Sequence, residues 1–235
     1  ATTIQANQTA GFSIVKFTSP ASGSGTIRMA HGLSQAPEWM ILKNLDDNSN
    51  WEVYHKRNYE INGATHTLHL NATDASAAVN AGVDFWTEAP TASYFSLKNL
   101  SSIAQNKNAI MYCWHGVPGY SKFGSYTGNG NADGAFIYTG FKPSWLIIKC
   151  TSHAVSWYIF DNKRNPFNPA GKRLTAEGTY VEDAGTTEAL DFYSNGFKLR
   201  NTSNGTNGSG RTFVYMAFAE CPFNGDGSTA FATAR

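Results

Sequence analysis

The sequence predicts an all-β protein made of two tandem β-sandwich modules of the jelly-roll or lectin-like kind. Its 22 glycines and 21 asparagines outnumber its 11 leucines almost fourfold, which favours turns and short strands over helices. Short apolar segments alternate with turn clusters rich in Gly, Asn, Ser and Asp, as strands and their connections do. The second half of the chain also repeats the pattern of the first. We therefore expect an internal duplication.

The repeat is clearest where residues 37–43 (PEWMILK) resemble residues 143–149 (PSWLIIK), an offset of 106 residues. Trp51 and Trp157 follow at the same offset. Because both modules must fold, residues that recur in both are expected to be structural, so recurring tryptophans are expected in the core or the sheets. The other matching segments are Phe17 with Phe123, residues 31–33 with 139–141, residues 95–98 with 197–200, and residues 110–114 with 214–218.

These matches place the elements in order. Residues 1–119 form a predicted first module, residues 120–224 a second module, and residues 225–235 a flexible or assembly tail. Each module is expected to form strands at its matching segments and after its repeated tryptophan. Residues 145–149 are almost continuously apolar, which is typical of a central strand covered on both faces. The alanine-rich residues 72–81 are expected to be a loop or a single helical turn.

Composition excludes several classes of function. Charged residues make up 15% of the chain and the formal net charge is +1, so no nucleic-acid partner is expected. The longest apolar runs are far shorter than the ~20 residues that cross a bilayer, so no membrane insertion is expected. The cysteines Cys113, Cys150 and Cys221 are widely spaced, which predicts free, mostly buried thiols and no zinc site.

The sequence also lacks the usual signals of an enzyme. It has no G-x-S-x-G motif, its histidines are scattered, and its carboxylates lie mostly in turns rich in Gly, Asn, Ser or Thr. The acid-rich loops lack the spacing of a calcium-binding hand. We expect no catalytic residues, no metal and no cofactor. Asp161, which follows a predicted strand and precedes Lys163 and Arg164, is the most interesting acid; its simpler interpretation is an ion pair that closes a turn.

Residues 117–130 (VPGYSKFGSYTGNG) and 133–143 (DGAFIYTGFKP) resemble a repeat found in virion proteins of tailed bacteriophages, especially marine ones. The pattern continues through residues 157–161, 194–200 and 215–220, and less closely through the first module. The resemblance implies a tail-fibre or other appendage protein, located on the virion, with no assigned catalytic residues.

We therefore expect a non-enzymatic virion subunit that contacts other virion proteins and attaches to a host-surface glycan. Exposed strand edges would be closed by symmetric association, which favours a homotrimer. The alternatives are a glycan depolymerase or carbohydrate-binding module of a secreted enzyme, and a purely structural decoration or joint protein. The residues expected to contact a glycan are Trp51, Tyr54 and Arg57 in the first module and Trp157, Tyr158, Asp161, Lys163 and Arg164 in the second.

Overall fold

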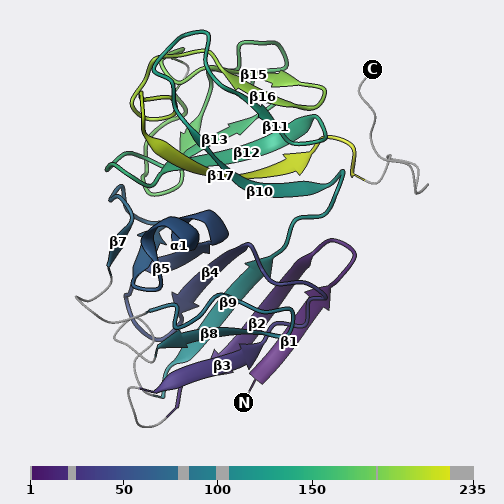
Figure 1. Ribbon diagram of the computed structural model, residues 1–235, viewed down its shortest axis with the longest axis vertical. Helices are drawn as coiled ribbons and strands as arrows, with labels where there is room; N and C mark the ends of the chain where they lie inside the picture. The colour runs from purple at the N-terminus through teal and green to yellow at the C-terminus, as the bar shows by residue number, and fades with distance from the viewer. Residues whose placement is uncertain (1, 21–24, 79–84, 99–105, 184, 223–235) are drawn as a thin grey trace. The chain divides into compact units, whose positions relative to one another are not determined.

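The computed structural model describes residues 2–20, 25–78, 85–98, 106–183 and 185–222 (Figure 1). These residues form seventeen strands and one short helix, and all the strand pairings are antiparallel. The expected all-β class is confirmed. The predicted tail, residues 225–235, lies outside the described residues.

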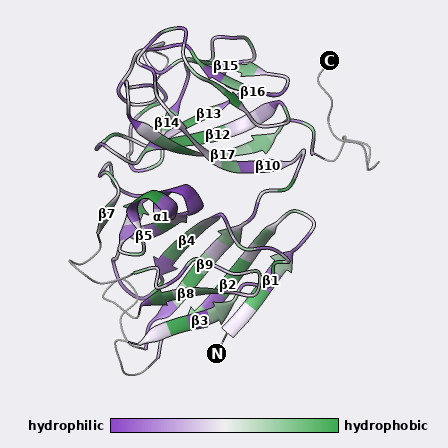
Figure 2. Cartoon of the chain, in the orientation of Figure 1, coloured by the Kyte–Doolittle hydropathy of each residue, from purple (hydrophilic) through white to green (hydrophobic). Residues whose placement is uncertain are grey.

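The chain divides into two compact units, Ala1–Gly116 and Val117–Arg235, close to the predicted boundary after residue 119. Each unit has its own hydrophobic core. Figure 2 shows both hydrophobic and hydrophilic residues along the strands, and fully buried residues alternate with less buried ones along β2 and β9, as expected for strands with one face on a core. The two units are therefore described separately.

The first unit is a two-layer sandwich. A seven-stranded sheet has the order β1-β2-β9-β4-β5-β6-β7, and a two-stranded sheet pairs β3 with β8. Buried side chains of both sheets, such as Val15 and Met111 from the larger and Phe95 from the smaller, form one core. The strands are β1 (Thr2–Asn7), β2 (Phe12–Thr18), β3 (Thr26–Ala30), β4 (Trp39–Asn44), β5 (Trp51–His55), β6 (His66–His69), β7 (Ala77–Ala78), β8 (Tyr94–Lys98) and β9 (Asn108–Trp114).

The second unit is built in the same way. A five-stranded sheet, β10-β17-β12-β13-β14, and a three-stranded sheet, β11-β16-β15, enclose its core. Leu146 and Phe160 of the larger sheet pack with Phe197 of the smaller one. The strands are β10 (Ser121–Thr127), β11 (Phe136–Tyr138), β12 (Pro143–Cys150), β13 (Tyr158–Asp161), β14 (Leu174–Thr175), β15 (Leu190–Tyr193), β16 (Gly196–Leu199) and β17 (Thr212–Ala219).

The central strands of the two units correspond. The order β2-β9-β4-β5-β6 matches β10-β17-β12-β13-β14, and the β3-β8 pair matches β11-β16. The β4–β5 register pairs Met40 with Tyr54, and the β12–β13 register pairs Leu146 with Phe160, at the offset of 106 residues. This correspondence supports the internal duplication, which stays a prediction.

A lysine beside a tryptophan recurs in the hairpin that joins these strands. The Lys43 ammonium lies 5.9 Å from the centre of the Trp51 ring and donates to the Ser49 carbonyl. Lys149 lies 5.7 Å from Trp157 and donates to the carbonyl of Val155. A cation over an indole ring is a favourable contact, and the carbonyl fixes the ammonium there. This repeated arrangement holds the two strands together in each unit.

The sheet register revises one of the sequence matches. Phe17 pairs with Ala109, which pairs in turn with Asn44 on β4. In the second unit the equivalent row joins Cys150 to Phe213 and Phe213 to Tyr126. Tyr126, not Phe123, therefore takes the place of Phe17, and it packs against the core. The match failed because both aromatics lie on one strand and sequence spacing alone does not fix a register.

The helix α1 (Lys56–Asn62) was not expected. Its start is stabilised by the His55 side chain, whose Nδ1 accepts a hydrogen bond from the Arg57 backbone N–H at 3.0 Å. It ends at Gly63, whose φ of 83° suits glycine. Residues 72–78, part of the segment expected to be a loop or helical turn, contain no helix; they include the short strand β7. Residues 72–76 are the loop that was one of the two expectations, and pairing with β6 makes residues 77–78 a strand, which was not expected.

The cysteines agree with the prediction. Cys113 and Cys150 are buried and free, and Cys221 is free and exposed. Burial raises the pKa of the Cys113 thiol far above its ordinary value, against a smaller opposing effect of the hydrogen bond with Ser13.

Candidate functional sites

The recurring tryptophans are structural. Trp39 and Trp157 are fully buried, whereas Trp51 and Trp145 are partly buried within their sheets. Trp157 is 0% exposed beside Lys149, so a sugar has no access to its ring. This burial removes Trp157 from the predicted glycan contacts. Trp157 directly precedes β13 at the end of the hairpin, and the Lys149 ammonium lies over its ring there.

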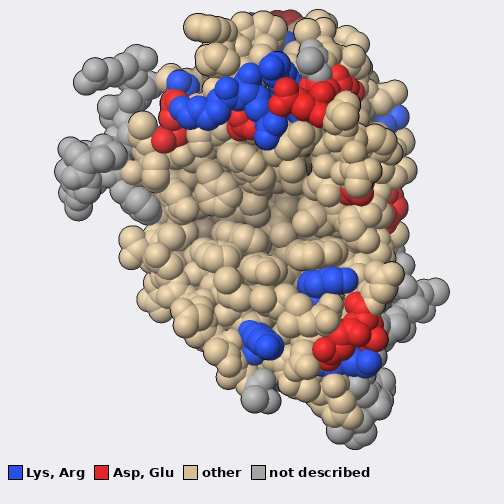
Figure 3. Space-filling model, turned by 180° about the vertical axis from the view of Figure 1, so that it is seen from behind, with Lys and Arg blue, Asp and Glu red and all other residues tan. Residues whose placement is uncertain are grey.

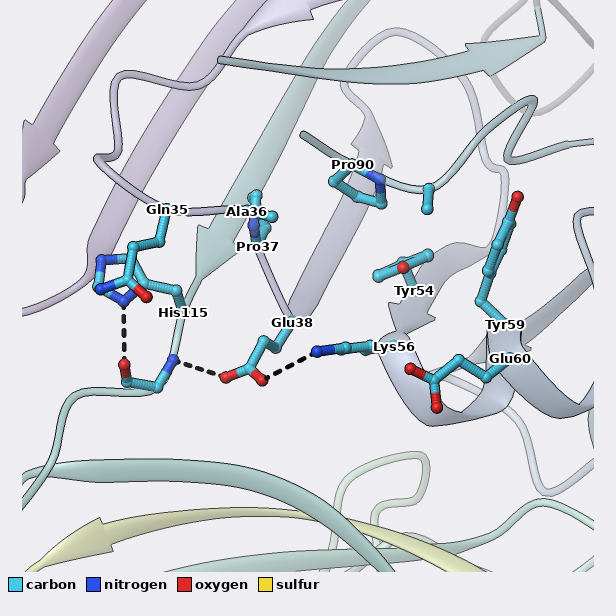
Figure 4. A pocket seen from close by; sticks show the side chains of 12 residues that line it. Gln35, Ala36, Pro37, Glu38, Tyr54, Lys56, Tyr59, Glu60, Pro90 and His115 are labelled. Carbon is cyan, nitrogen blue, oxygen red and sulfur yellow. Dashed lines mark hydrogen bonds and ion pairs between the residues drawn. The ribbon is translucent and has the colours of Figure 1, made fainter. Parts of the chain in front are cut away.

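Tyr54 lines a pocket of the first unit, whereas Arg57 lies outside the lining and pairs with Glu60, which belongs to it (Figure 4). The pocket has a volume of about 560 Å³ and includes Tyr54, Glu38, Lys56 and Glu60 in its lining. Tyr54 is almost wholly buried, and burial is the main reason that its phenol has a pKa far above the ordinary value. It therefore forms part of the pocket floor and presents little surface of its own.

The charged groups of this pocket are held by neighbours. Glu38 Oε2 accepts a hydrogen bond from the Gly116 backbone N–H at 2.8 Å, and Oε1 lies 3.9 Å from Lys56 Nζ. Figure 4 shows Glu38 and Lys56 pointing toward each other. Glu60 pairs with Arg57 at 3.1 Å, on the exposed side of α1. The pocket thus combines two carboxylates and one ammonium above a tyrosine.

In the second unit, Asp161 closes a turn, as its simpler interpretation predicted. Its Oδ1 accepts hydrogen bonds from the backbone N–H groups of Lys163 and Arg164, at 3.0 and 2.7 Å. Its Oδ2 lies 2.6 Å from Arg164 Nε. Arg164 also contacts Glu182 at 2.6 Å, and this hydrogen bond is the largest of the effects that lower the Glu182 pKa. Asp161 and Arg164 are thereby occupied in a local ion-pair network.

Tyr158 and Lys163 border separate hollows. Tyr158 is half-buried, with the Arg173 guanidinium 5.4 Å from its ring centre, and lines a pocket of about 420 Å³. Lys163 lines another pocket of about 360 Å³. Figure 3 shows a band of lysine and arginine side chains, with acidic side chains beside it, on the unit at the top of the view. The predicted residues of the second unit are thus spread over a charged surface and do not form one cluster.

One sheet of the second unit carries a group of exposed aromatic residues that was not predicted from the sequence. Phe136, Tyr138 and Tyr193 are 46%, 59% and 37% exposed. They lie on the outer face of the β11-β16-β15 sheet, and we call them the aromatic face. Phe136 and Tyr193 are in edge-to-face contact, with ring centres 5.8 Å apart. Exposed rings gathered on one sheet offer a binding surface.

Strand pairing explains why these rings face outward together. Tyr138 and Tyr193 both pair with Gly196 of the central strand β16, while Ile137, between the two β11 aromatics, points into the core. A Cβ on Gly196 would lie 2.9 Å from Phe136 Cζ and 2.2 Å from the Ile137 carbonyl oxygen. The absence of a side chain at Gly196 therefore lets the Phe136 ring lie over the central strand.

Charged side chains border the aromatic face. Lys198 pairs with Asp133 at 2.6 Å, and Arg200 pairs with Asp191 at 2.5 Å. The hydrogen bond with Lys198 is the main reason that the Asp133 pKa lies below its ordinary value. Arg200 Nη2 also donates to the Tyr193 hydroxyl at 3.2 Å. Lys122 lies 5.2 Å from the Tyr138 ring centre. The rings thus lie beside donors and acceptors that are already fixed in position.

Among the described residues of the first unit, the equivalent strands do not carry such a surface. By pairing across the equivalent strands, Arg28 and Ala30 of β3 take the places of Phe136 and Tyr138. Tyr94 takes the place of Gly196, and the Arg28 guanidinium lies 5.6 Å from its ring. The aromatic face is therefore not needed to build this kind of sheet.

Two further structural findings bear on function. Among the residues that the structure describes, no group of three or more His, Cys, Asp or Glu side chains is arranged to hold a metal ion. Within the same residues, no helix has the length and apolar character needed to cross a membrane.

The fold and these surfaces define an all-β protein of two sandwich units with an exposed aromatic sheet face. Residues 1–222 match a family described as "Domain of unknown function (DUF7483)", and the chain belongs to this family. The match spans both units up to residue 222. No curated protein and no solved structure matches the chain.

Proposed function

We propose that this protein is a non-enzymatic subunit of a bacteriophage tail fibre or related virion appendage, and that the aromatic face attaches it to a host-surface glycan. The resemblance of residues 117–143 to phage virion repeats supports the location on the virion. The aromatic face supports glycan binding, because aromatic rings stack on the C–H faces of sugars and nearby polar groups fix the hydroxyls.

The observation that carries the proposal is the exposure of Phe136, Tyr138 and Tyr193 on a single sheet whose partner strands bring charged groups beside them. Exposed aromatic residues that are scattered singly over a surface are common and need no explanation, whereas exposed apolar residues gathered in one patch often mark a binding site. The three rings of the aromatic face lie on one sheet, and the described residues of the equivalent sheet in the first unit do not form such a group. A rigid sheet also presents them without a large ordering cost on binding.

A glycan array with matched variants tests the proposal. Phe136→Ala and Tyr138→Ala remove exposed rings from the aromatic face, whereas Tyr180→Ala removes a ring that is even more exposed but lies in another part of the unit. We expect the first two to weaken binding to the best array glycan about tenfold, about 1.4 kcal/mol, and Tyr180→Ala to leave it unchanged. Equal binding by all variants, or no glycan bound by the wild type, would overturn the proposal.

The pocket of the first unit gives the depolymerase alternative a specific basis, because Glu38 and Glu60 both line it. Glycoside hydrolysis uses such a carboxylate pair. We expect no release of reducing ends from the bound glycan. Release that is abolished by Glu38→Gln or Glu60→Gln would establish the enzyme instead.

A purely structural role has its own support in β1. This strand is at the edge of its sheet, all six of its residues are exposed, and among the described strands it pairs with β2 alone. Exposed edges favour association with another chain, and we propose a homotrimer. Light scattering gives the oligomer order. Protection of Phe136 and Tyr138 from solvent on assembly would make the aromatic face an interface and leave glycan binding to another protein.

A further inference from the structure

A pocket of the second unit, separate from the aromatic face, combines features of a ligand site. It has a volume of about 360 Å³ and lies where β12 begins and where β13 and β17 end. Lys142 precedes Pro143, and Lys163 and Glu220 follow the other two strands. We call it the lysine pocket. The remaining lining residues are Asn162, Asn165, Pro166, Phe167, Asn168 and Phe192.

The charges of the lysine pocket do not balance. Glu220 Oε2 lies 2.7 Å from Lys142 Nζ, and its Oε1 lies 3.6 Å from Lys163 Nζ. The hydrogen bond from Lys142 is the main effect that lowers the Glu220 pKa, so the carboxylate stays ionised at neutral pH. Two ammonium groups therefore share one carboxylate. Lys163, whose side chain is 80% exposed and only loosely paired, retains hydrogen-bond donors for an anion.

A buried amide and an exposed ring complete the pocket. Asn162 is 8% exposed, and its Nδ2 donates to Glu220 at 2.9 Å, which helps to hold that carboxylate in place. Phe167 is 81% exposed, so its ring is open to stacking. The pocket thus offers positive charge and an aromatic surface together.

The pocket at the equivalent place in the first unit has different chemistry. It too lies at the start of one central strand and the end of its neighbour, but it contains Glu38 and Glu60 with one lysine, Lys56. Its charge balance is negative where that of the lysine pocket is positive. The positive balance is therefore not a requirement of the sandwich fold.

We propose that the lysine pocket binds an anionic sugar, one that carries a carboxylate or a phosphate group. The ammonium groups of Lys142 and Lys163 contact the anion, and Phe167 stacks on the sugar ring. This inference rests on the proposed glycan-binding function and names the kind of sugar that the second unit selects.

Titration calorimetry on the full chain tests it with D-glucuronate, D-glucose 6-phosphate and D-glucose. The two anions distinguish a carboxylate from a phosphate ligand, and glucose is the neutral reference. We expect at least one anion to bind about tenfold more tightly than glucose at about 50 mM salt, and to lose that advantage at about 500 mM salt. Equal affinity for all three sugars, or no anion binding up to about 50 mM ligand, would overturn the proposal.

Substitutions inside and outside the lysine pocket test whether the anion binds there. Lys163→Gln and Phe167→Ser change exposed side chains of the lysine pocket, and Lys172→Gln is the matched control because that lysine pairs with Glu182 outside it. We expect Lys163→Gln to remove the preference for the anion and Phe167→Ser to weaken the anionic and neutral sugars alike. Loss of the preference in Lys172→Gln to the same extent would show a diffuse surface charge effect and contradict the pocket.

The two proposals fail separately. If Tyr138→Ala abolishes binding to an array glycan while the calorimetry shows no preference for an anion, only the lysine pocket falls. If an anionic sugar binds and Lys163→Gln removes it while Tyr138→Ala leaves the array result unchanged, the aromatic face falls and the lysine pocket stands.

Discussion

His69 lies between two carboxylates in the first unit. Its Nε2 is 3.1 Å from Glu52 Oε2 and its Nδ1 is 2.8 Å from Asp74 Oδ2. Glu52 is buried, and its strand β5 pairs with the β6 strand that carries His69. Burial of His69 opposes its charged form, but the hydrogen bonds and charges of Glu52 and Asp74 outweigh it and raise the pKa of the imidazole.

This raised pKa predicts a dependence of stability on pH. The charged imidazole favours the folded state, so its contribution is full below about pH 6.5, the ordinary histidine pKa, and is lost as the pH rises through the folded-state value. Urea denaturation at pH 5.5 and at pH 8.5 measures it. We expect His69→Gln to reduce the free energy of unfolding more at the lower pH. An equal reduction at both pH values would contradict the ion pair.

The same substitution is expected to reduce the free energy of unfolding more at Lys149 than at Lys43. Lys149 is 0% exposed and holds the Val155 carbonyl, so Lys149→Met leaves that oxygen without its lysine donor and should destabilise the second unit by about 1–3 kcal/mol. Lys43 is only partly buried, and water can replace it, so Lys43→Met should cost less. Denaturation curves of both variants measure the difference; a larger loss for Lys43→Met would argue against the role of burial.

Among the elements, β16 depends most visibly on a single residue. A Cβ at Gly196 would meet the Ile137 backbone oxygen at 2.2 Å, and backbone cannot yield as a flexible side chain does. We expect Gly196→Ala to separate β11 from β16, lower the stability by about 1–3 kcal/mol and weaken glycan binding together. Thermal melting with the array assay checks this. Gly25→Ala is the control, because nothing lies within 4 Å of the added atom. Unchanged stability in Gly196→Ala would contradict the packing.

The sequence predicts some elements well and others poorly, for physical reasons. β4 and β12 were found because a central strand buried on both faces is continuously apolar. β1 was missed because all its residues are exposed and no apolar pattern marks it. The aromatic face was missed because Phe136, Ile137 and Tyr138 are all hydrophobic. Only pairing with β16 shows that Ile137 is buried and its neighbours are exposed.

The sequence predicted the types of residue that lie at the pockets, but not which of them are exposed there. An aromatic residue within β5 and a charged residue after β13 do lie at pockets, as Tyr54 and Lys163 show. The sequence did not show which of these residues are accessible. The Trp157 ring, for example, lies beside Lys149, a residue on the other arm of the same hairpin. The charge balance of the lysine pocket depends on Glu220, which only the fold brings beside Lys142.

At the scale of the whole molecule, two separate cores predict two separable unfolding events. Each unit buries its own cluster of side chains, so a substitution in one core should leave the other largely unaffected. Differential scanning calorimetry of Lys149→Met should shift one transition to lower temperature and leave a second in place. A single transition that shifts as a whole would show that the two units unfold together.

The central claim is that sugars bind to the aromatic face of the second unit. Titration of a ring-labelled sample with the best array glycan, followed by NMR, tests it directly. We predict that the ring signals of Phe136, Tyr138 and Tyr193 shift on binding, whereas the buried ring of Phe213, in the core beneath, does not. Glycan binding with no change in the signals of Phe136, Tyr138 and Tyr193 would contradict the claim.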